Sequence, residues 1–183
     1  ENLAWLIENC YKRKMILQLH FGTYRNVNSA AYGQCGKDSG FDIMRGAIDT
    51  DKLVKIFDRE NMRLGGLPKI VVYPLNDYDL RAIATLTGAF PQVKLGAAWW
   101  FNDTVNGIKR QMETAAEYSA LGTQYGMLTD SRSFSSYVRF DFYRRILSSF
   151  IGEKVEKGEY DENAAITLAK KIAYENIKNA LAV

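Results

Sequence analysis

The sequence predicts an α/β protein in which helices cover a sheet of parallel strands. Two observations support this class. Short apolar runs alternate along the chain with segments whose apolar residues recur at helical spacing. The apolar runs are nearly continuous, which is typical of parallel strands because both faces of such a sheet are buried. The 183 residues suit one domain, so we expect a single domain over 1–183.

The first predicted strand covers residues 14–20 and follows the end of a helix. A long loop, rich in Asn, Gly and Ser, is expected from residue 23 to about 46. Helical spacing resumes after Asp49, and the Gly65-Gly66 pair ends that helix. The chain starts without an initiator Met or a basic leader, so we expect it to begin after processing or within a longer protein.

Three further strand–helix units complete the predicted pattern. Their strands are expected at 70–75, 93–100 and 125–129. The helices after them begin near Asn76, Val105 and Tyr137. A polar linker over 154–160 then leads to a final amphipathic helix over 165–177. The four predicted strands are too few for a complete (β/α)8 barrel, which needs at least ~200 residues, so a barrel could only be half present.

The composition excludes several classes of function. A net charge of +3 without a block of like charges gives no electrostatic footprint for nucleic acid. The longest apolar runs fall far short of the ~20 residues of a membrane span, so no membrane partner is expected. A single histidine excludes a histidine cluster supplied by this chain alone. Two cysteines without CxxC spacing are typical of a reduced, cytoplasmic protein.

Polar and aromatic side chains follow the predicted strands at the point where each strand ends. The clusters are His20 to Arg25, Asn76-Asp77, Trp99 to Asp103, and Asp130 to Arg132. The carboxyl ends of parallel strands lie at one edge of a sheet, where α/β proteins place their chemistry. The pattern therefore predicts one active-site face, without deciding between a barrel and an open sheet.

Each cluster has a functional and a structural interpretation. Asp130 could bind a metal or move a proton, and Arg132 could clamp a carboxylate, but this segment could equally cap the next helix. His20 could be a catalyst or a satisfied structural group. Arg25 lies in a loop long enough to be functional, or simply solvated. Trp99 and Trp100 could line a ligand site or belong to the core.

Taken together, these clusters resemble uronate isomerase (glucuronate isomerase), a family of the amidohydrolase superfamily. The resemblance spans nearly the whole chain, and the pair WWFND and GMLTDSRSF at this spacing is highly specific. The carrying segments are LQLHFG (17–22), RNVN (25–28), DSGFD (38–42), GLPK (66–69), WWFND (99–103), GMLTDSRSF (126–134), SY (136–137) and YRRIL (143–147).

The resemblance implies a fold and an activity. It places this chain on the C-terminal half of a (β/α)8 barrel of the TIM type, with about four strands and a C-terminal helix; the N-terminal half, with its His-x-His pair, is absent. The implied reaction interconverts D-glucuronate with D-fructuronate, and D-galacturonate with D-tagaturonate, in uronate catabolism. The implied partner is therefore a small uronate substrate, and we expect a homo-oligomer. We also expect residues 1–183 alone to be inactive.

The resemblance also implies roles for individual residues. Asp130 matches a ligand of a divalent metal, usually zinc, and His20 matches a histidine at the catalytic site. Arg132 matches the arginine that holds the uronate carboxylate, with Arg25 as a second candidate. Trp99 and Trp100 match tryptophans that line the site, without a decision on which faces the substrate.

Two alternatives remain open from the sequence. One is a metal-dependent hydrolase of the same superfamily, which would usually carry a further ligand histidine on the next strand; residues 73–76 at the end of the second predicted strand contain none. The other is a non-catalytic half-barrel that acts only in assembly.

Overall fold

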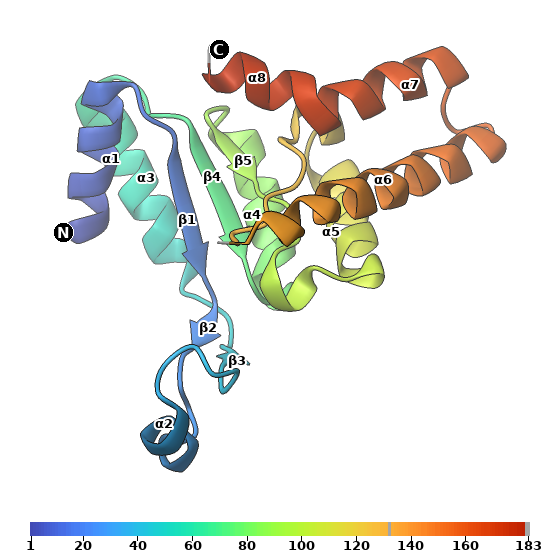
Figure 1. The fold of residues 1–183 in the computed structure, drawn as a ribbon. Coiled ribbons are helices and arrows are strands. Elements are labelled where there is room, and N and C mark those ends of the chain that lie inside the picture. The colour runs from blue at the N-terminus through green and yellow to red at the C-terminus, as the bar shows by residue number, and fades with distance from the viewer. Residues whose placement is uncertain (132, 182–183) are drawn as a thin grey trace.

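A computed structural model describes residues 1–131 and 133–181 (Figure 1). Its centre is a parallel sheet in the order β1-β4-β5, formed by Leu17–Phe21, Ile70–Pro74 and Val93–Leu95. Leu17 pairs with Ile70, and Ile70 pairs with Val93. The predicted parallel α/β class is therefore confirmed. All three strands are shorter than predicted: the first starts at Leu17, the second ends at Pro74, and the third ends at Leu95 rather than continuing into the tryptophans.

The predicted helices flank this sheet. In chain order they are α1 Asn2–Arg13, α3 Thr50–Leu64, α4 Asp77–Ala89 and α5 Val105–Tyr118. Asp49, Asn76 and Thr104 cap α3, α4 and α5 by accepting backbone N–H bonds, as their residue types favour. The predicted starts of α3, α4 and α5 are thus confirmed.

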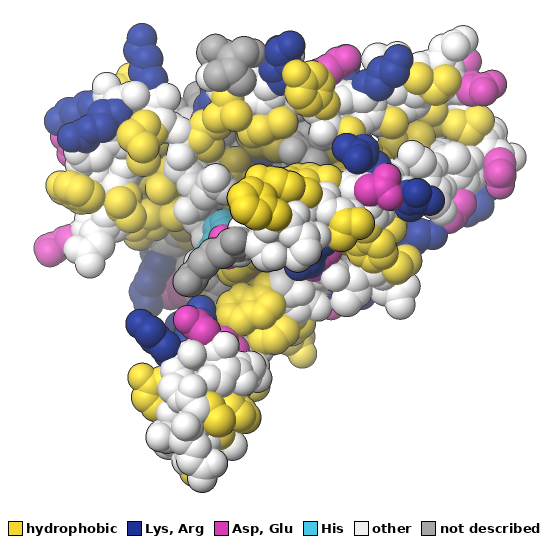
Figure 2. Space-filling model, viewed as in Figure 1, with side chains coloured by type: hydrophobic (Ala, Val, Ile, Leu, Met, Phe, Trp, Pro, Cys, Tyr) yellow, Lys and Arg dark blue, Asp and Glu magenta, His cyan; other side chains and the backbone are white. Residues whose placement is uncertain are grey.

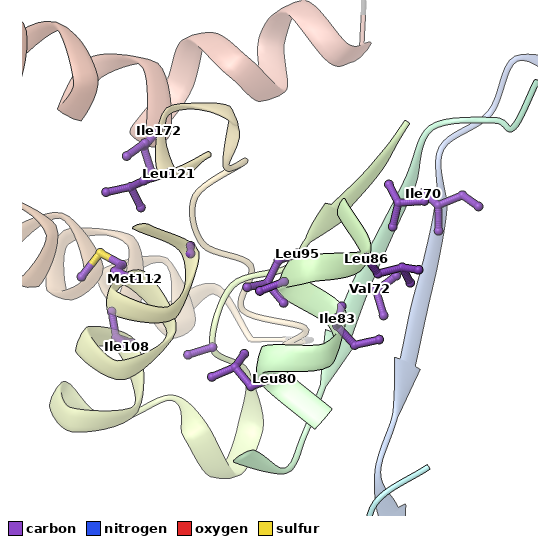
Figure 3. Packing of buried hydrophobic residues seen from close by; sticks show 14 of the residues in the cluster. Ile70, Val72, Leu80, Ile83, Leu86, Leu95, Ile108, Met112, Leu121 and Ile172 are labelled. Atoms are coloured by element: carbon purple, nitrogen blue, oxygen red, sulfur yellow. The ribbon is translucent and has the colours of Figure 1, made fainter. Parts of the chain in front are cut away.

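The core lies between the sheet and the helices that cover it. Every residue of β4 is buried, so the central strand is apolar throughout, as its sequence predicted. Figure 3 shows Ile83 of α4 close to Val72 of β4, and both side chains are fully buried. Ile108 and Met112 of α5 extend the same core toward Leu121 and the C-terminal helices (Figure 3).

The loop expected over 23–46 contains regular structure, which corrects that expectation. Thr23–Tyr24 (β2) and Ile43–Met44 (β3) pair antiparallel, and Ser29–Cys35 forms α2 between them. We call residues 23–46 the arm, because they extend away from the body of the molecule (Figure 1). No residue of α2 is buried, so its helical spacing carries no apolar signal. Its start is set instead by Asn28, whose side chain accepts the N–H of Ala31.

The segment 125–129, expected as a fourth strand, does not form one, and this prediction is wrong. Two contacts explain the difference. Gly126 adopts a φ of +73° and lies against the backbone carbonyl of Ile172. The side chain of Asn176 donates to the carbonyls of Gly122 and Gln124, just upstream. Contacts with the C-terminal helices, rather than hydrogen bonds to a neighbouring strand, therefore fix the start of this segment.

The C-terminal part of the chain is helical. A 3₁₀ turn, Phe134–Tyr137, leads into α6 Val138–Glu156, which takes up the start of the expected linker. The final helix is longer than expected: α7 Glu162–Lys170, one π-helical turn Lys171–Glu175 and α8 Asn176–Leu181 follow without a break. Asp161 caps α7. Within residues 1–131 and 133–181, no helix combines the length and apolar character needed to cross a membrane.

Candidate active site

An open cleft of about 620 Å³ lies beyond the carboxyl ends of the strands. This volume suits a small-molecule ligand. The cleft is lined by His20, Arg25, Asp38, Gly40, Asp42, Trp99, Trp100, Thr129, Asp130, Ser131 and Arg139. Five of the six residues singled out from the sequence are therefore brought together, from three separate parts of the chain. The sixth, Arg132, lies outside the described residues.

His20 lines this cleft with a side chain that is partly open to solvent, coloured cyan in Figure 2. Its ring packs on Tyr73 and Trp99, with centroids 4.5 Å and 4.3 Å away. Burial against these rings lowers the pKa of His20, and the charge of Asp130 opposes that effect. The imidazole is thus kept neutral near pH 7, so one ring nitrogen can accept a proton or bind a metal.

Tyr73, whose ring packs against His20, was not predicted as a site residue from the sequence. It is 6% exposed, and burial raises the pKa of Tyr73 to about 12, so the phenol stays protonated. Gly96 permits its position, because a Cβ there would lie 2.1 Å from the Tyr73 ring. A glycine directly after a short strand is the only sequence signal of this close approach.

The two tryptophans occupy different places in the cleft. Trp99 packs on His20, whereas Trp100 packs on Phe101 and lies under the Arg25 guanidinium, 5.1 Å from the ring centroid. Trp100 has a φ of +53°, an outlier for a bulky side chain. Both tryptophans line the cleft.

Arg25 is held by two carboxylates of the arm. It pairs with Asp38, and its Nε lies 3.1 Å from an oxygen of Asp42, which is 6% exposed. The other Asp42 oxygen accepts the backbone N–H of Asn26 at 2.7 Å. Arg25 therefore joins the arm to Trp100, and its charge is largely balanced before any ligand arrives. Neither aspartate had a role predicted from the sequence.

Unusual backbone conformations gather around the cleft. Asn26, Asp38, Trp100 and Asp130 all have a positive φ, between +48° and +62°. Non-glycine residues pay a conformational cost there, which surrounding contacts must offset, and such positions concentrate at functional sites. Asp130 thus lines the cleft from a constrained backbone.

The side chains facing the cleft suit a divalent metal only in part. Asp130 and His20 offer the carboxylate and the imidazole that zinc favours, and both line the same cleft. Among the described residues, no group of three or more His, Cys, Asp or Glu side chains could hold a metal. A catalytic zinc normally takes three protein ligands, so this part of the chain supplies only some of them.

An imidazole, a carboxylate, an arginine and an aromatic wall meet in one cleft beyond the carboxyl ends of a parallel sheet, the place where α/β enzymes hold their active sites. The sequence model of the glucuronate isomerase family matches residues 1–181. The chain belongs to that family, so the resemblance noted from its sequence is confirmed.

Individual relatives agree with this assignment. A uronate isomerase of Haemophilus influenzae is 38% identical over 97% of this chain. The crystal structure of uronate isomerase from Thermotoga maritima matches with a TM-score of 0.88 at 32% identity, over 97% of this chain. That of glucuronate isomerase from Caulobacter crescentus matches with a TM-score of 0.90 at 29% identity, over all of it. The chain spans 38–39% of the length of each of these relatives.

Proposed function

We propose that this chain is the C-terminal portion of a uronate isomerase and supplies part of its active site. The reaction interconverts D-glucuronate with D-fructuronate, and D-galacturonate with D-tagaturonate. The observation that carries the proposal is the cleft in which His20, Arg25, both tryptophans and Asp130 meet. Family membership over residues 1–181 gives that cleft its reaction class.

The same proposal extends to the architecture. Residues 1–183 act as one domain that supplies half of a (β/α)8 barrel of the TIM type. In support, β1 is an edge strand of the described sheet, with β4 as its one described neighbour. A groove of about 520 Å³ also runs between β1, residues 125–128 and α8. An open edge beside a groove is where the remaining strands of a barrel would pack.

The residues of the cleft suit an aldose–ketose isomerisation. Such a reaction moves a proton between adjacent carbons and must stabilise an enediolate-like charge. Asp130 and His20 face the same space, and each can accept or return a proton. Arg25, together with Arg132, provides guanidinium groups for the uronate carboxylate, and Trp99 and Trp100 form an apolar wall.

A divalent metal, zinc by preference, would be held in part by Asp130, and when bound it would supply Lewis-acid stabilisation of negative charge. The proposed protein is a cytoplasmic homo-oligomer with a small-molecule partner. Its portion within residues 1–183 is expected to be inactive alone, because it carries one candidate carboxylate ligand and one imidazole.

Metal-dependent hydrolysis is the second candidate function, and one feature weighs against it. Strand β4 ends at Pro74 and is followed by Leu75 and Asn76, so this strand end offers no further histidine ligand. The amide of Asn76 is already engaged with the carbonyls of Arg45 and Gly46, which fixes the arm to the sheet.

The test is a glucuronate-to-fructuronate assay of the full-length protein with Asp130→Asn. We expect kcat to fall by about 10²- to 10⁴-fold, the range for loss of a positioned acid or base. Asp161→Asn is the matched control, because asparagine also caps a helix and Asp161 lies at the start of α7. A full-length protein that hydrolyses substrates but does not isomerise uronates would overturn the proposal.

A further inference from the structure

An ion pair at the edge of the cleft, with a buried carboxylate and a partly exposed guanidinium, joins two of its walls. Asp103 follows the 3₁₀ turn Trp100–Asn102, and its side chain is 3% exposed. It pairs with Arg139, which lies in the first turn of α6 and is 39% exposed. Arg139 also lines the cleft. Neither residue had a role predicted from the sequence.

Within residues 1–131 and 133–181, each wall also has anchoring contacts of its own. The tryptophan wall is anchored to the end of β4, where the Asn102 amide donates to the Leu75 carbonyl at 2.7 Å. Gly107 packs so closely on the Asn102 carbonyl that a Cβ would lie 2.1 Å from it. The segment after Asp130 is held by its own serines, Ser131, Ser133 and Ser136. Among the described residues, Asp103–Arg139 is the side-chain ion pair that joins these two segments.

Burial makes this pair costly to break. One oxygen of Asp103 is fully buried and has no hydrogen-bond partner among the described residues. The carboxylate therefore depends on Arg139 for its compensation, and removing the guanidinium leaves a buried charge without a partner. The tryptophan wall must then move until Asp103 reaches water.

We propose that the Asp103–Arg139 pair positions the tryptophan wall against Asp130 for the isomerase reaction. The inference deepens the proposed function and rests on it. Both residues are positioning residues: they act through Trp99, Trp100 and Asp130. Because a displacement of about 1 Å can cost about 100-fold in rate, the pair should affect turnover more than fold.

The test uses the full-length enzyme with Asp103→Asn, Arg139→Met and Arg139→Lys. We expect the first two to lower kcat/KM for glucuronate by about 10- to 100-fold. The double variant should be no worse than the single ones, because the two residues act as a unit. Arg139→Lys should restore part of the activity, since it returns the positive charge. The matched control is Glu153→Gln, which breaks the exposed Lys109–Glu153 pair between α5 and α6 and should leave kcat/KM unchanged.

A second readout does not need turnover. With 5-fluorotryptophan incorporated, the ¹⁹F resonances of Trp99 and Trp100, assigned from Trp→Phe variants, should shift in Asp103→Asn but not in Glu153→Gln. If Asp103→Asn shifts these resonances but the wild-type enzyme does not isomerise uronates, the positioning role is supported and the proposed function is refuted. Unchanged resonances with wild-type kcat/KM in both Asp103→Asn and Arg139→Met would overturn the inference, as would equal losses in the control.

Discussion

At the scale of single residues, the cleft is built from groups whose neighbours set their chemistry. Two opposing effects act on the pKa of His20. Burial against the rings of Tyr73 and Trp99 favours the neutral imidazole, and the charge of Asp130 favours the imidazolium. Burial is the larger effect, so the pKa of His20 lies below its ordinary value. A proton acceptor that stays neutral at physiological pH follows from that balance.

This balance predicts the effect of Asp130→Asn on His20. Removal of the carboxylate charge should lower the pKa of His20 further, because only burial then acts on it. Titration of the imidazole resonances by NMR, assigned with His20→Gln, measures the change, and Asp161→Asn should leave the titration unaltered. An unchanged or raised pKa in Asp130→Asn would show that the two groups are not coupled.

The same shift makes stability depend on pH. The folded state binds the His20 proton less readily than the unfolded chain, whose pKa is about 6.5. The contribution to stability is therefore fully present above about pH 6.5 and is lost as the pH falls through the lower folded pKa. Urea unfolding between pH 5 and 8 should show this loss in wild type and a weaker one in His20→Gln.

Residue pattern and family resemblance together predicted most residues of this cleft but not the residues that support them. His20, Arg25, Trp99, Trp100 and Asp130 could be predicted because each follows a strand or belongs to a family motif. Their supporting residues could not: Asp42 and Arg139 act through contacts between segments distant in sequence. A sequence pattern reports spacing along the chain and carries no information about such partners.

At the scale of elements, apolar periodicity predicted the helices and strands that pack into the core, and it failed for segments outside the core. The wholly buried strand β4 and the helices α3 and α4 were predicted because hydrophobic burial fixes them. Residues 125–129 read as a strand because they are apolar, yet contacts with Ile172 and Asn176 replace strand pairing there. The helix α2 escaped prediction because it buries no side chain.

The junction after β5 gives a prediction at this scale. Gly96→Ala should destabilise the protein by about 1–3 kcal/mol, the cost of overpacking, because its Cβ would overlap the Tyr73 ring. The displaced ring would also disturb His20, so isomerase activity of the full-length protein should fall. Guanidinium unfolding and the uronate assay measure the two effects.

Gly88→Ala is the matched control, since it lies in α4 with no atom within 4 Å of its added Cβ. It should be neutral or stabilise the protein by up to about 1 kcal/mol, because alanine favours the helix. Equal stability of the two alanine variants would mean that Tyr73 does not depend on Gly96.

At the scale of the whole molecule, the sheet described within residues 1–131 and 133–181 ends in two edge strands, β1 and β5, and an open groove lies beside β1. Strand β1 has β4 as its described neighbour, and the groove beside it is lined by apolar side chains that include Met15, Ile16, Met127 and Leu181. Met15 is 55% exposed. Unpaired strand edges next to apolar surface promote association.

The 183-residue chain expressed alone should therefore associate, bind the dye ANS, bind zinc weakly and show no isomerase turnover. Light scattering, dye fluorescence, zinc calorimetry and the uronate assay measure these four properties.

Met15→Lys should reduce the association without unfolding the chain, because a charge at the groove opposes pairing at the edge of β1. Lys37 lies in the arm, so Lys37→Met serves as the reverse control and should not change association at β1. A dye-free monomer that binds zinc below 1 µM, on the order expected of a complete site, and turns over glucuronate would place the whole active site within these residues and refute the half-barrel.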